Sequence, residues 1–266
     1  MTKDRDKSLL TLFEGFFKDL VEAILPPKCL ICGAFERRQQ VEERGKADRL
    51  AHLTDPYFCA SCRSNIAEIA SPLCSTCGLP FVSREGEDHT CSECLVERKY
   101  FRRARAFGVY EGSLMEAIHR FKYTKKTSLS RPLSALTKET FCQFWGPEAI
   151  DLLIPVPLHI RRLRERGFNQ AYLMIRRWAK LEEIPCDAFA MLRTRWTEPQ
   201  TSLSRKERKK NMRRAFAVRN PESIRGRRVL LIDDVYTTGS TANECARVLA
   251  EAGAELVDVL TLARAV

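Results

Sequence analysis

The sequence lacks a long uninterrupted run of apolar residues. A membrane-spanning helix needs about 20 consecutive apolar residues, and the core of a secretory signal peptide needs about 7–15. The most apolar stretch near the start of the chain, Leu9 to Leu25, is interrupted by the charged residues Glu14, Lys18, Asp19 and Glu22. We therefore expect no transmembrane segment and no export, and we predict a cytoplasmic location.

Two common phosphate-binding patterns are also absent. The sequence contains no GxxxxGK[ST] motif, which holds the phosphates of nucleoside triphosphates, and no GxGxxG dinucleotide fingerprint. Only four histidines are present, and neither a Ser/His/Asp nor a Cys/His group is evident. We therefore name no nucleophile and no general base, and the catalytic residues stay unknown.

Charge is plentiful but unevenly distributed. The 266 residues are 44% hydrophobic and 30% charged, an ordinary composition for a soluble globular protein, with a formal net charge of +11. Residues 161–228 contain 20 Lys and Arg against 7 Asp and Glu, a surplus of +13. Aromatic residues lie among these basic ones, a mixture expected where single-stranded DNA binds. Core packing is the commoner explanation for these aromatics, which are Phe168, Trp178, Trp196 and Phe216.

Eleven cysteines are present, which in a reducing compartment favours metal binding over disulfides. A CxxC turn lets two sulfur atoms converge on one tetrahedral ion, and two such turns complete a structural zinc site. Buried free thiols or redox pairs would have to produce this spacing four times by chance. The four CxxC turns therefore predict two structural zinc ions, with the ligands Cys29, Cys32, Cys59, Cys62, Cys74, Cys77, Cys91 and Cys94.

The spacing alone does not determine which turns share an ion. Sequential sites and interleaved sites fit it equally well, and we favour the sequential arrangement. Gly33 and Gly78 directly follow the first and third CxxC turns. A backbone that wraps around a metal benefits there from a residue that tolerates positive φ.

The sequence predicts three regions. Residues 1–28 contain an amphipathic helix, because apolar residues recur near helical spacing until Pro26 and Pro27 end the pattern. We favour packing of this helix against the rest of the protein over a membrane-surface or partner-binding role. Residues 29–100 form the zinc-ribbon module, and residues 101–266 form an α/β domain.

From about Phe101 onward, strand and helix patterns alternate. This alternation predicts a doubly wound parallel sheet, in which ligands bind beyond the carboxyl ends of the strands. The expected strands are 105–110, 151–156, 189–193, 215–218, 228–232 and 256–262, and the expected helices are 113–122, 129–145, 168–181 and 240–252.

The most specific pattern of the chain begins where the strand 228–232 ends. Asp233 and Asp234 come first, followed by a hydroxyl-rich loop and then by a helix. The N–H groups and the positive dipole end of a helix start bind one phosphate, and neighbouring carboxylates accept hydrogen bonds from sugar hydroxyls. The pattern therefore indicates a ribose 5-phosphate site that comprises Asp233, Asp234, Val235, Tyr236, Thr237, Thr238, Gly239, Ser240 and Thr241.

This strand, acid pair and Thr-Gly-rich loop resemble those of the type I phosphoribosyltransferases. The chain as a whole, with cysteine knuckles ahead of such a domain, is more closely similar to the ComF family, which is associated with competence and DNA uptake. The resemblance extends over nearly the full length. It also includes Pro155 to Leu158, Arg166 to Ala171, and Pro199 through Asn211 to Phe216.

The resemblance implies binding of phosphoribosyl pyrophosphate (PRPP) together with Mg²⁺. Asp233 and Asp234 would bind the ribose hydroxyls, and residues 237–241 would hold the 5-phosphate. The segment at the end of the strand 151–156 corresponds to the pyrophosphate loop, made of Pro155, Val156, Pro157 and Leu158. Further phosphate contacts are expected from Arg166, Asn169, Gln200 and Arg208.

The basic segment 197–214 suits an active-site flap that closes over a ligand, and an irregular surface loop is an equally good explanation. We expect a ComF-like protein of phosphoribosyltransferase fold that binds Mg-PRPP and acts in DNA uptake. Single-stranded DNA and DNA-uptake proteins are its expected partners. Two alternatives remain, namely a phosphoribosyltransferase of nucleotide salvage or synthesis, and a non-catalytic DNA-binding module. The sequence identifies no acceptor pocket and does not decide whether the protein is an enzyme.

Overall fold

The computed structural model describes residues 27–35, 49–83, 85–196 and 214–266. The chain divides into two compact units, Met1–Arg63 and Ser64–Val266. The predicted helix in residues 1–28 and most of the predicted flap lie outside the described residues. The boundaries that we expect near residues 28 and 100 stay predictions.

The described part of the first unit is organised around four cysteines and the buried ring of Phe58. Its short helices are α2 (Arg49–Thr54) and α3 (Ala60–Ser64), the last residue of which belongs to the second unit. Arg63 is buried, pairs with Asp55 and donates from Nη1 to the carbonyl oxygen of Phe58 at 2.6 Å. In the described part of this unit, metal ligands and the ion pair of a buried arginine accompany the small apolar cluster.

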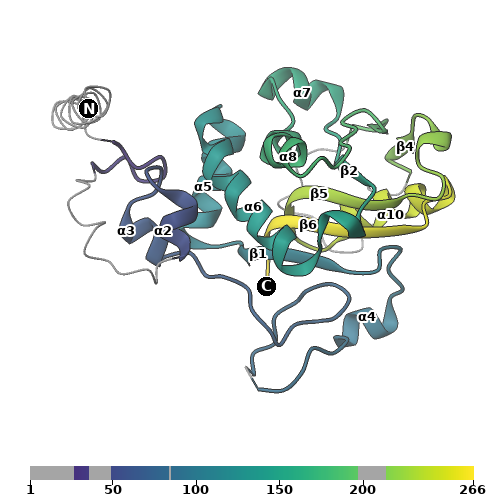
Figure 1. Cartoon of the computed structure of the whole chain (residues 1–266), viewed down its shortest axis with the longest axis horizontal. Coiled ribbons are helices and arrows are strands. Elements are labelled where there is room, and N and C mark those ends of the chain that lie inside the picture. The colour runs from purple at the N-terminus through teal and green to yellow at the C-terminus, as the bar shows by residue number, and fades with distance from the viewer. Residues whose placement is uncertain (1–26, 36–48, 84, 197–213) are drawn as a thin grey trace, which may run out of the picture. The chain divides into compact units, whose positions relative to one another are not determined.

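A four-stranded sheet forms the centre of the second unit (Figure 1). Its strands are β1 (Ala104–Val109), β2 (Leu152–Pro155), β5 (Arg228–Tyr236) and β6 (Leu256–Arg264). Their order is β1-β6-β5-β2, and all three neighbouring pairs are parallel. A separate antiparallel pair joins β3 (Met191–Arg193) to β4 (Phe216–Val218).

Helices cover both faces of the sheet, which confirms the doubly wound arrangement. Val229 and Leu231 of β5 share a buried cluster with Leu249 of α10 (Ser240–Glu251). Alternation along the strand turns Leu230 and Ile232, both fully buried, to the opposite face. That face carries α6 (Ser130–Phe144) and α8 (Gln170–Leu181), which pack against each other.

The other helices of the described residues lie in the connections. They are α4 (Ser92–Val96), α5 (Gly112–Tyr123), α7 (Ile160–Arg166), and the short 3-10 turns η2 (Thr127–Leu129), η3 (Pro147–Ala149) and η4 (Pro221–Ser223). The sequence did not predict α7 as a helix of its own. Among the described residues, no helix has the length and apolar character that crossing a bilayer requires.

The strand that carries the acids is longer than predicted. We expected it to end at Ile232, but β5 continues to Tyr236, because its ladder with β6 continues: Asp233 pairs with Thr261, Val235 with Ala263, and Tyr236 with Arg264. Both acids therefore lie on the strand and not in the loop. The loop proper begins only at Thr237.

Candidate functional site

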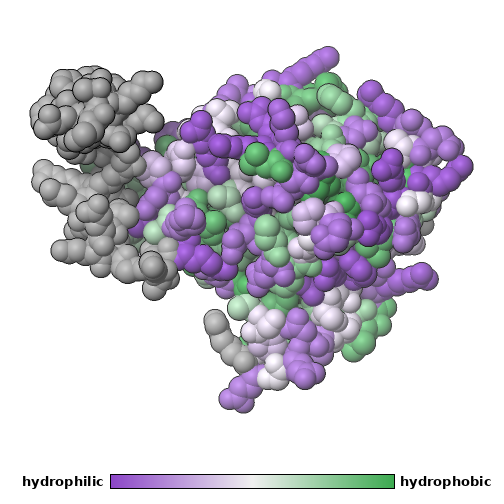
Figure 2. Space-filling model, in the orientation of Figure 1, coloured by the Kyte–Doolittle hydropathy of each residue, from purple (hydrophilic) through white to green (hydrophobic). Residues whose placement is uncertain are grey.

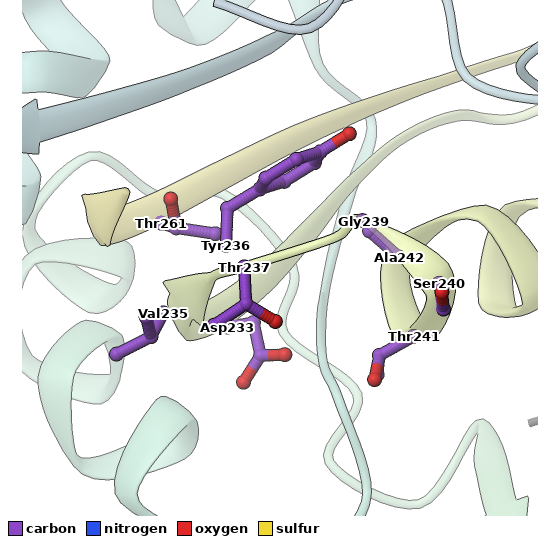
Figure 3. Close-up of a pocket in the computed structure, with 9 residues that line it drawn as sticks. All are labelled: Asp233, Val235, Tyr236, Thr237, Gly239, Ser240, Thr241, Ala242 and Thr261. Atoms are coloured by element: carbon purple, nitrogen blue, oxygen red, sulfur yellow. The ribbon is translucent and has the colours of Figure 1, made fainter. Parts of the chain in front are cut away.

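The carboxyl end of β5 and the start of α10 form a small pocket (Figure 3). Asp233 lines it on one side, and the loop lines it on the other. Gly239 precedes the helix in a left-handed conformation, with φ of +70°. The pocket also includes Thr261 of β6, and its other lining residues are Val235, Tyr236, Thr237, Gly239, Ser240, Thr241 and Ala242.

The loop hydroxyls are preorganised by their own hydrogen bonds. The hydroxyl oxygens of Thr238 and Ser240 lie 2.9 Å apart, and the Ser240 N–H donates to the Thr238 hydroxyl at 3.4 Å. The N-cap residue Gly239 has no side chain to cap α10, although the N–H of Ser240 already donates to the Thr238 hydroxyl. The N–H groups that follow Ser240 and the positive dipole end of the helix therefore remain suited to an anion.

Asp233 carries an unusual carboxyl group. Burial raises its pKa, and the neighbouring charge of Asp234 raises it further, to about 7. A hydrogen bond from the Asp234 backbone N–H and the positive charges of Lys122 and Arg193 act in the opposite direction. The backbone N–H of Asp234 donates to Asp233 Oδ1 at 2.8 Å. A carboxyl group held this way is close to its titration point at neutral pH, so a donor or cation from a ligand would favour its ionised form.

Asp234 faces a different group of residues from Asp233. It is only 5% exposed, and its Oδ2 forms an ion pair with Lys122 Nζ at 2.9 Å. Burial opposes the charge of Lys122, but the attraction of Asp234 outweighs it and raises the pKa of the lysine. Adjacent strand residues point to opposite faces, so the two acids do not line one pocket. Part of the predicted acid pair is therefore already engaged by a side chain of the protein.

Lys122 and Arg193 are neighbours of the acids that the sequence did not predict. Lys122 lies on α5 and Arg193 on β3, far from the motif in sequence, and Arg193 contributes positive charge near Asp233. No local pattern distinguishes these two residues from the other Lys and Arg of a basic chain. Only the fold brings them to this end of the sheet.

The predicted pyrophosphate loop lies beside β5. Pro155 pairs with Ile232 in the sheet, and the Val156 N–H donates to the Ile232 carbonyl oxygen at 2.8 Å. Asn169 supports this loop by donating from Nδ2 to the Val156 carbonyl oxygen at 3.0 Å. Its Oδ1 also accepts from the N–H groups at the start of α8, so the side chain is engaged in holding backbone.

Arg166, a predicted phosphate contact, lies apart from the arginines that precede it on α7. Arg166 is 9% exposed, lies over the ring of Tyr123 and donates from Nη1 to Gln170 Oε1 at 2.5 Å. Burial lowers its pKa despite the nearby negative charge of Asp234. Arg161 and Arg162 instead lie over the ring of Trp196, at 5.7 and 5.6 Å from its centroid. Gln200 and Arg208 lie outside the described residues.

The eight cysteines of the four CxxC turns converge in two clusters. The ligands are Cys29, Cys32, Cys59 and Cys62 in the first unit, and Cys74, Cys77, Cys91 and Cys94 in the second. Within each cluster the sulfur atoms lie within 4.8 Å of one another. This confirms the sequential pairing. The positive φ values of Gly33 (81°) and Gly78 (67°) match the expectation for both knuckles.

The donor geometry fits zinc. Four sulfur atoms at about 2.3 Å from a tetrahedral ion lie roughly 3.8 Å apart, and the Cys32–Cys59 and Cys77–Cys91 Sγ distances are 3.6 and 3.8 Å. Burial opposes the thiolate of Cys74, but N–H groups of Cys91 and Cys77 outweigh it and lower its pKa to about 6. Backbone N–H groups of Cys59 and Cys32 similarly lower the pKa of Cys29 to about 7.

A second concave surface lies between α6 and α8, which we call the α6/α8 groove. Among its lining residues four are basic and none is acidic, although Lys138 is paired with Glu182 just outside it. The groove is lined by Ser130, Arg131, Ser134, Ala135, Lys138, Tyr172, Leu173, Arg176, Arg177, Trp178 and Leu181. On the face that Figure 2 shows, hydrophilic residues predominate on the described surface.

Two family models match the chain. The phosphoribosyl transferase domain matches residues 165–265, and the double zinc ribbon domain matches residues 48–95. The first match includes the loop at Gly239, and the second includes six of the eight clustered cysteines. Together with the sheet and the two cysteine clusters, they show a phosphoribosyltransferase-type fold joined to a zinc-ribbon module.

Curated relatives match most of the chain. Competence protein F of Haemophilus influenzae is 34% identical over 227 residues, which cover 79% of this chain and 97% of that protein. DNA utilization protein YhgH of Escherichia coli K12 is 32% identical and covers 80% and 99%. Competence protein ComFC of Bacillus subtilis is 30% identical and covers 79% and 85%.

Two solved structures resemble the chain over 54% of its length. One is described as the allosteric regulatory enzyme of purine biosynthesis, with 18% identity and a TM-score of 0.37. The other is glutamine PRPP amidotransferase from B. subtilis, with the same identity and TM-score. The chain spans 29% and 30% of the lengths of these two proteins.

Proposed function

The chain belongs to the ComF family, and from this premise we propose that it acts in DNA uptake in the cytoplasm and binds Mg-PRPP at the end of β5. DNA-uptake proteins are its proposed partners. The observation that carries the PRPP part is the pocket that Asp233 shares with Thr237, Gly239 and Thr241. A carboxyl group and a helix start in one pocket suit the two ends of a ribose 5-phosphate.

Each part of the pocket has a distinct task in this proposal. Asp233 accepts a hydrogen bond from a ribose hydroxyl, and the N–H groups of residues 237–241 bind the 5-phosphate. Arg193 and Arg166 contribute positive charge near Asp233 that offsets the charge of the ligand, whereas the charge of Lys122 is already paired with Asp234. The exposed donors of the pocket are carboxylate and hydroxyl oxygens, the kind that Mg²⁺ prefers. Mg²⁺ bound with the ligand would neutralise charge on the pyrophosphate.

Calorimetric titration with Mg-PRPP tests this proposal. We expect binding to the full-length zinc-loaded protein and a loss of at least about tenfold in affinity for Asp233→Asn, because a hydrogen bond to a charged group contributes about 1.5–3 kcal/mol. Glu222→Gln is the matched control. In the part of the chain that the structure describes, Glu222 pairs with Arg225 on an exposed surface, where such a pair contributes little.

Two outcomes would contradict the proposal. Either the wild-type protein does not bind Mg-PRPP, or Asp233→Asn binds as tightly as Glu222→Gln. Titration with ribose 5-phosphate alone distinguishes binding at residues 237–241, which we call the phosphate loop, from binding at the pyrophosphate loop. If ribose 5-phosphate binds as tightly as Mg-PRPP, the pyrophosphate contributes nothing to affinity, and the site is limited to the phosphate loop.

We further propose that the α6/α8 groove binds single-stranded DNA. The basic lining of the groove supports this, because phosphates need cations along their path. Arg176 and Arg177 are exposed on α8, and Tyr172 supplies an aromatic ring nearby. Most of the segment 205–214, which the sequence also favours for DNA contact, lies outside the described residues.

Anisotropy of a labelled single-stranded oligonucleotide, measured over a range of salt concentrations, tests the groove. Arg176→Glu with Arg177→Glu should weaken binding and reduce the slope of log affinity against log salt by about 2. Arg219→Glu with Arg227→Glu is the control, because both residues are exposed and neither lines the groove. Equal effects of the two double variants would show a nonspecific charge effect and refute the groove. If the groove binds an acidic peptide but no oligonucleotide, the groove proposal is refuted in favour of a protein partner.

A further inference from the structure

Arg264, the last residue of β6, lies between the second cysteine cluster and the phosphate loop. It is 5% exposed. Its Nη1 donates to the carbonyl oxygen of Cys77 at 2.6 Å, and its Nη2 lies 3.4 Å from Cys77 Sγ. A second contact of the guanidinium is the ring of Tyr236, whose centroid is 4.4 Å from Arg264 Cζ.

The charges of this arrangement depend on a loaded cluster. Four thiolates around Zn²⁺ carry a net charge of about −2, which a buried guanidinium partly neutralises. Among the described residues, Arg264 Nε has no hydrogen-bond partner. The Cys77 knuckle is therefore the main polar partner of this buried cation. Loss of the ion would disorder the knuckle and leave the arginine without that partner.

Tyr236 connects the arginine to the loop. Its side chain is 4% exposed, and Phe101 contacts its ring edge-on at 6.3 Å between centroids. A Cβ atom added to Gly239 would lie 2.1 Å from the Tyr236 hydroxyl oxygen, so the loop backbone passes directly against that hydroxyl. Figure 3 shows the ring pointing away from Asp233. Tyr236 thus supports the loop and does not itself point at the proposed ribose.

These contacts form one continuous chain of packed groups within the second unit. The knuckle holds Arg264, the guanidinium holds the Tyr236 ring, and the ring determines where Gly239 can lie. A backbone hydrogen bond also holds the two strand ends together, because the N–H of Ala265, the residue after Arg264, donates to the Tyr236 carbonyl oxygen at 2.9 Å. Such a path gives two sites a shared structural element whose position both can influence.

We propose that Arg264 and Tyr236 are positioning residues that couple zinc occupancy of the second cluster to the conformation of the phosphate loop. Loading the cluster with zinc orders residues 237–241, and an anion bound by that loop slows zinc release. Thermodynamic linkage requires the effect of zinc on the anion affinity and the effect of the anion on the zinc affinity to be equal in free energy, while the release rate reports the direction of the coupling. The PRPP readout of this coupling depends on the proposed function, whereas the response of the loop to zinc does not.

Chelator challenge of the full-length protein tests the first direction. Zinc release to a chromophoric chelator should occur in two phases, and Arg264→Gln should accelerate one phase about tenfold while the other stays unchanged. The first cluster, in the other unit, is thus an internal reference. Arg103→Gln is the matched control, because Arg103 also lies over an aromatic ring, that of Trp145 at 4.9 Å, but among the described residues its side chain donates to the Phe144 carbonyl oxygen and not to a cysteine. Arg264→Lys, which keeps the charge, serves if the glutamine variant does not fold.

Hydrogen exchange tests the second direction. Partial chelation should increase hydrogen exchange at residues 236–241 while β5 residues 229–232 stay protected. The increase caused by chelation should be smaller in Tyr236→Leu and unchanged in Tyr236→Phe. Saturating Mg-PRPP should slow the Arg264-sensitive zinc phase in the wild-type protein and not in Tyr236→Leu. If PRPP does not bind at all, the proposed function fails, and the exchange experiment still decides the coupling. Unchanged loop exchange after loss of one zinc, or equal release rates in Arg264→Gln and wild type, would refute it.

Discussion

Asp233→Asn should make the ligand-free protein more stable at alkaline pH while it weakens PRPP binding. The ionised Asp233 is unfavourable in the folded protein, because burial and the charge of Asp234 raise its pKa from 3.8 to about 7. Asparagine removes the charge and keeps the carbonyl oxygen that accepts the Asp234 N–H. The substitution is therefore nearly isosteric and changes mainly the electrostatics.

The pH dependence follows from proton linkage. Between about pH 4 and pH 7 the folded state holds a proton on Asp233 that the unfolded chain has released, so the contribution of this group to stability falls as the pH rises through that range. The loss is complete above pH 7. A rise from 3.8 to about 7 corresponds to at most about 4 kcal/mol. Because Asp233 is only half-buried and faces an open pocket, we expect about 1–2 kcal/mol.

Urea unfolding of both proteins at pH 5.5 and pH 8 measures this difference. The signal is the fluorescence of Trp145 and Trp178, both buried in the second unit. The cysteine clusters also respond to pH, but they are common to both proteins and cancel in the comparison. The variant should exceed the wild type by about 1–2 kcal/mol at pH 8 and by much less at pH 5.5. A stability difference that is the same at both pH values, or a less stable variant at pH 8, would refute the conclusion that the charge of Asp233 destabilises the folded protein.

Three further predictions concern other parts of the structure. Gly239→Ala should lower the free energy of unfolding by about 1–3 kcal/mol and abolish PRPP binding in calorimetry, because φ is +70° and the new Cβ would meet the Tyr236 hydroxyl. Gly226→Ala is the control: its φ is +68° but the new Cβ meets open space, so its loss of stability measures the backbone strain alone. Lys122→Met should lower the free energy of unfolding by about 3 kcal/mol because it leaves Asp234 buried without its ion pair, and adding Asp234→Asn should restore most of it; no restoration would contradict the pairing. Native mass spectrometry should find two zinc ions per chain, and Cys32→Ser and Cys77→Ser should each lose one; loss of both from either variant would contradict independent clusters.

The local patterns predicted the elements of the second unit well. Apolar runs such as 229–232 are long enough to identify a strand, and the Gly after 240–252 marks the end of a helix. The predicted end of β5 was four residues too early. Pairing with β6 continues the strand through polar residues at which local propensity would end it. The short helix α7 was missed, since its four arginines show no apolar periodicity.

The candidate site was predictable only in part. The acids and the loop at Gly239 are contiguous in sequence, and their order along a strand, turn and helix is enough to propose a phosphate site. The partners of the acids are not contiguous. Lys122 precedes Asp234 by more than 100 residues, and Arg264 approaches Cys77 from the far end of the chain. Contacts at such separations depend on strand order, which no local pattern specifies.

By itself, the amino-acid sequence determined the chemistry that is encoded locally: two tetrahedral thiolate sites from CxxC spacing, a turn of a kind suited to phosphate, and alternating strands and helices. Each depends on residues a few positions apart, which chain connectivity keeps together in any fold. Tertiary structure alone decided how these parts meet. It turned Asp233 and Asp234 to different faces, paired one of them with Lys122, and placed Arg264 and Tyr236 between a cysteine cluster and the phosphate loop. The physical reason is that burial and charge act through space, so neither can be assigned until the sheet has brought distant side chains together.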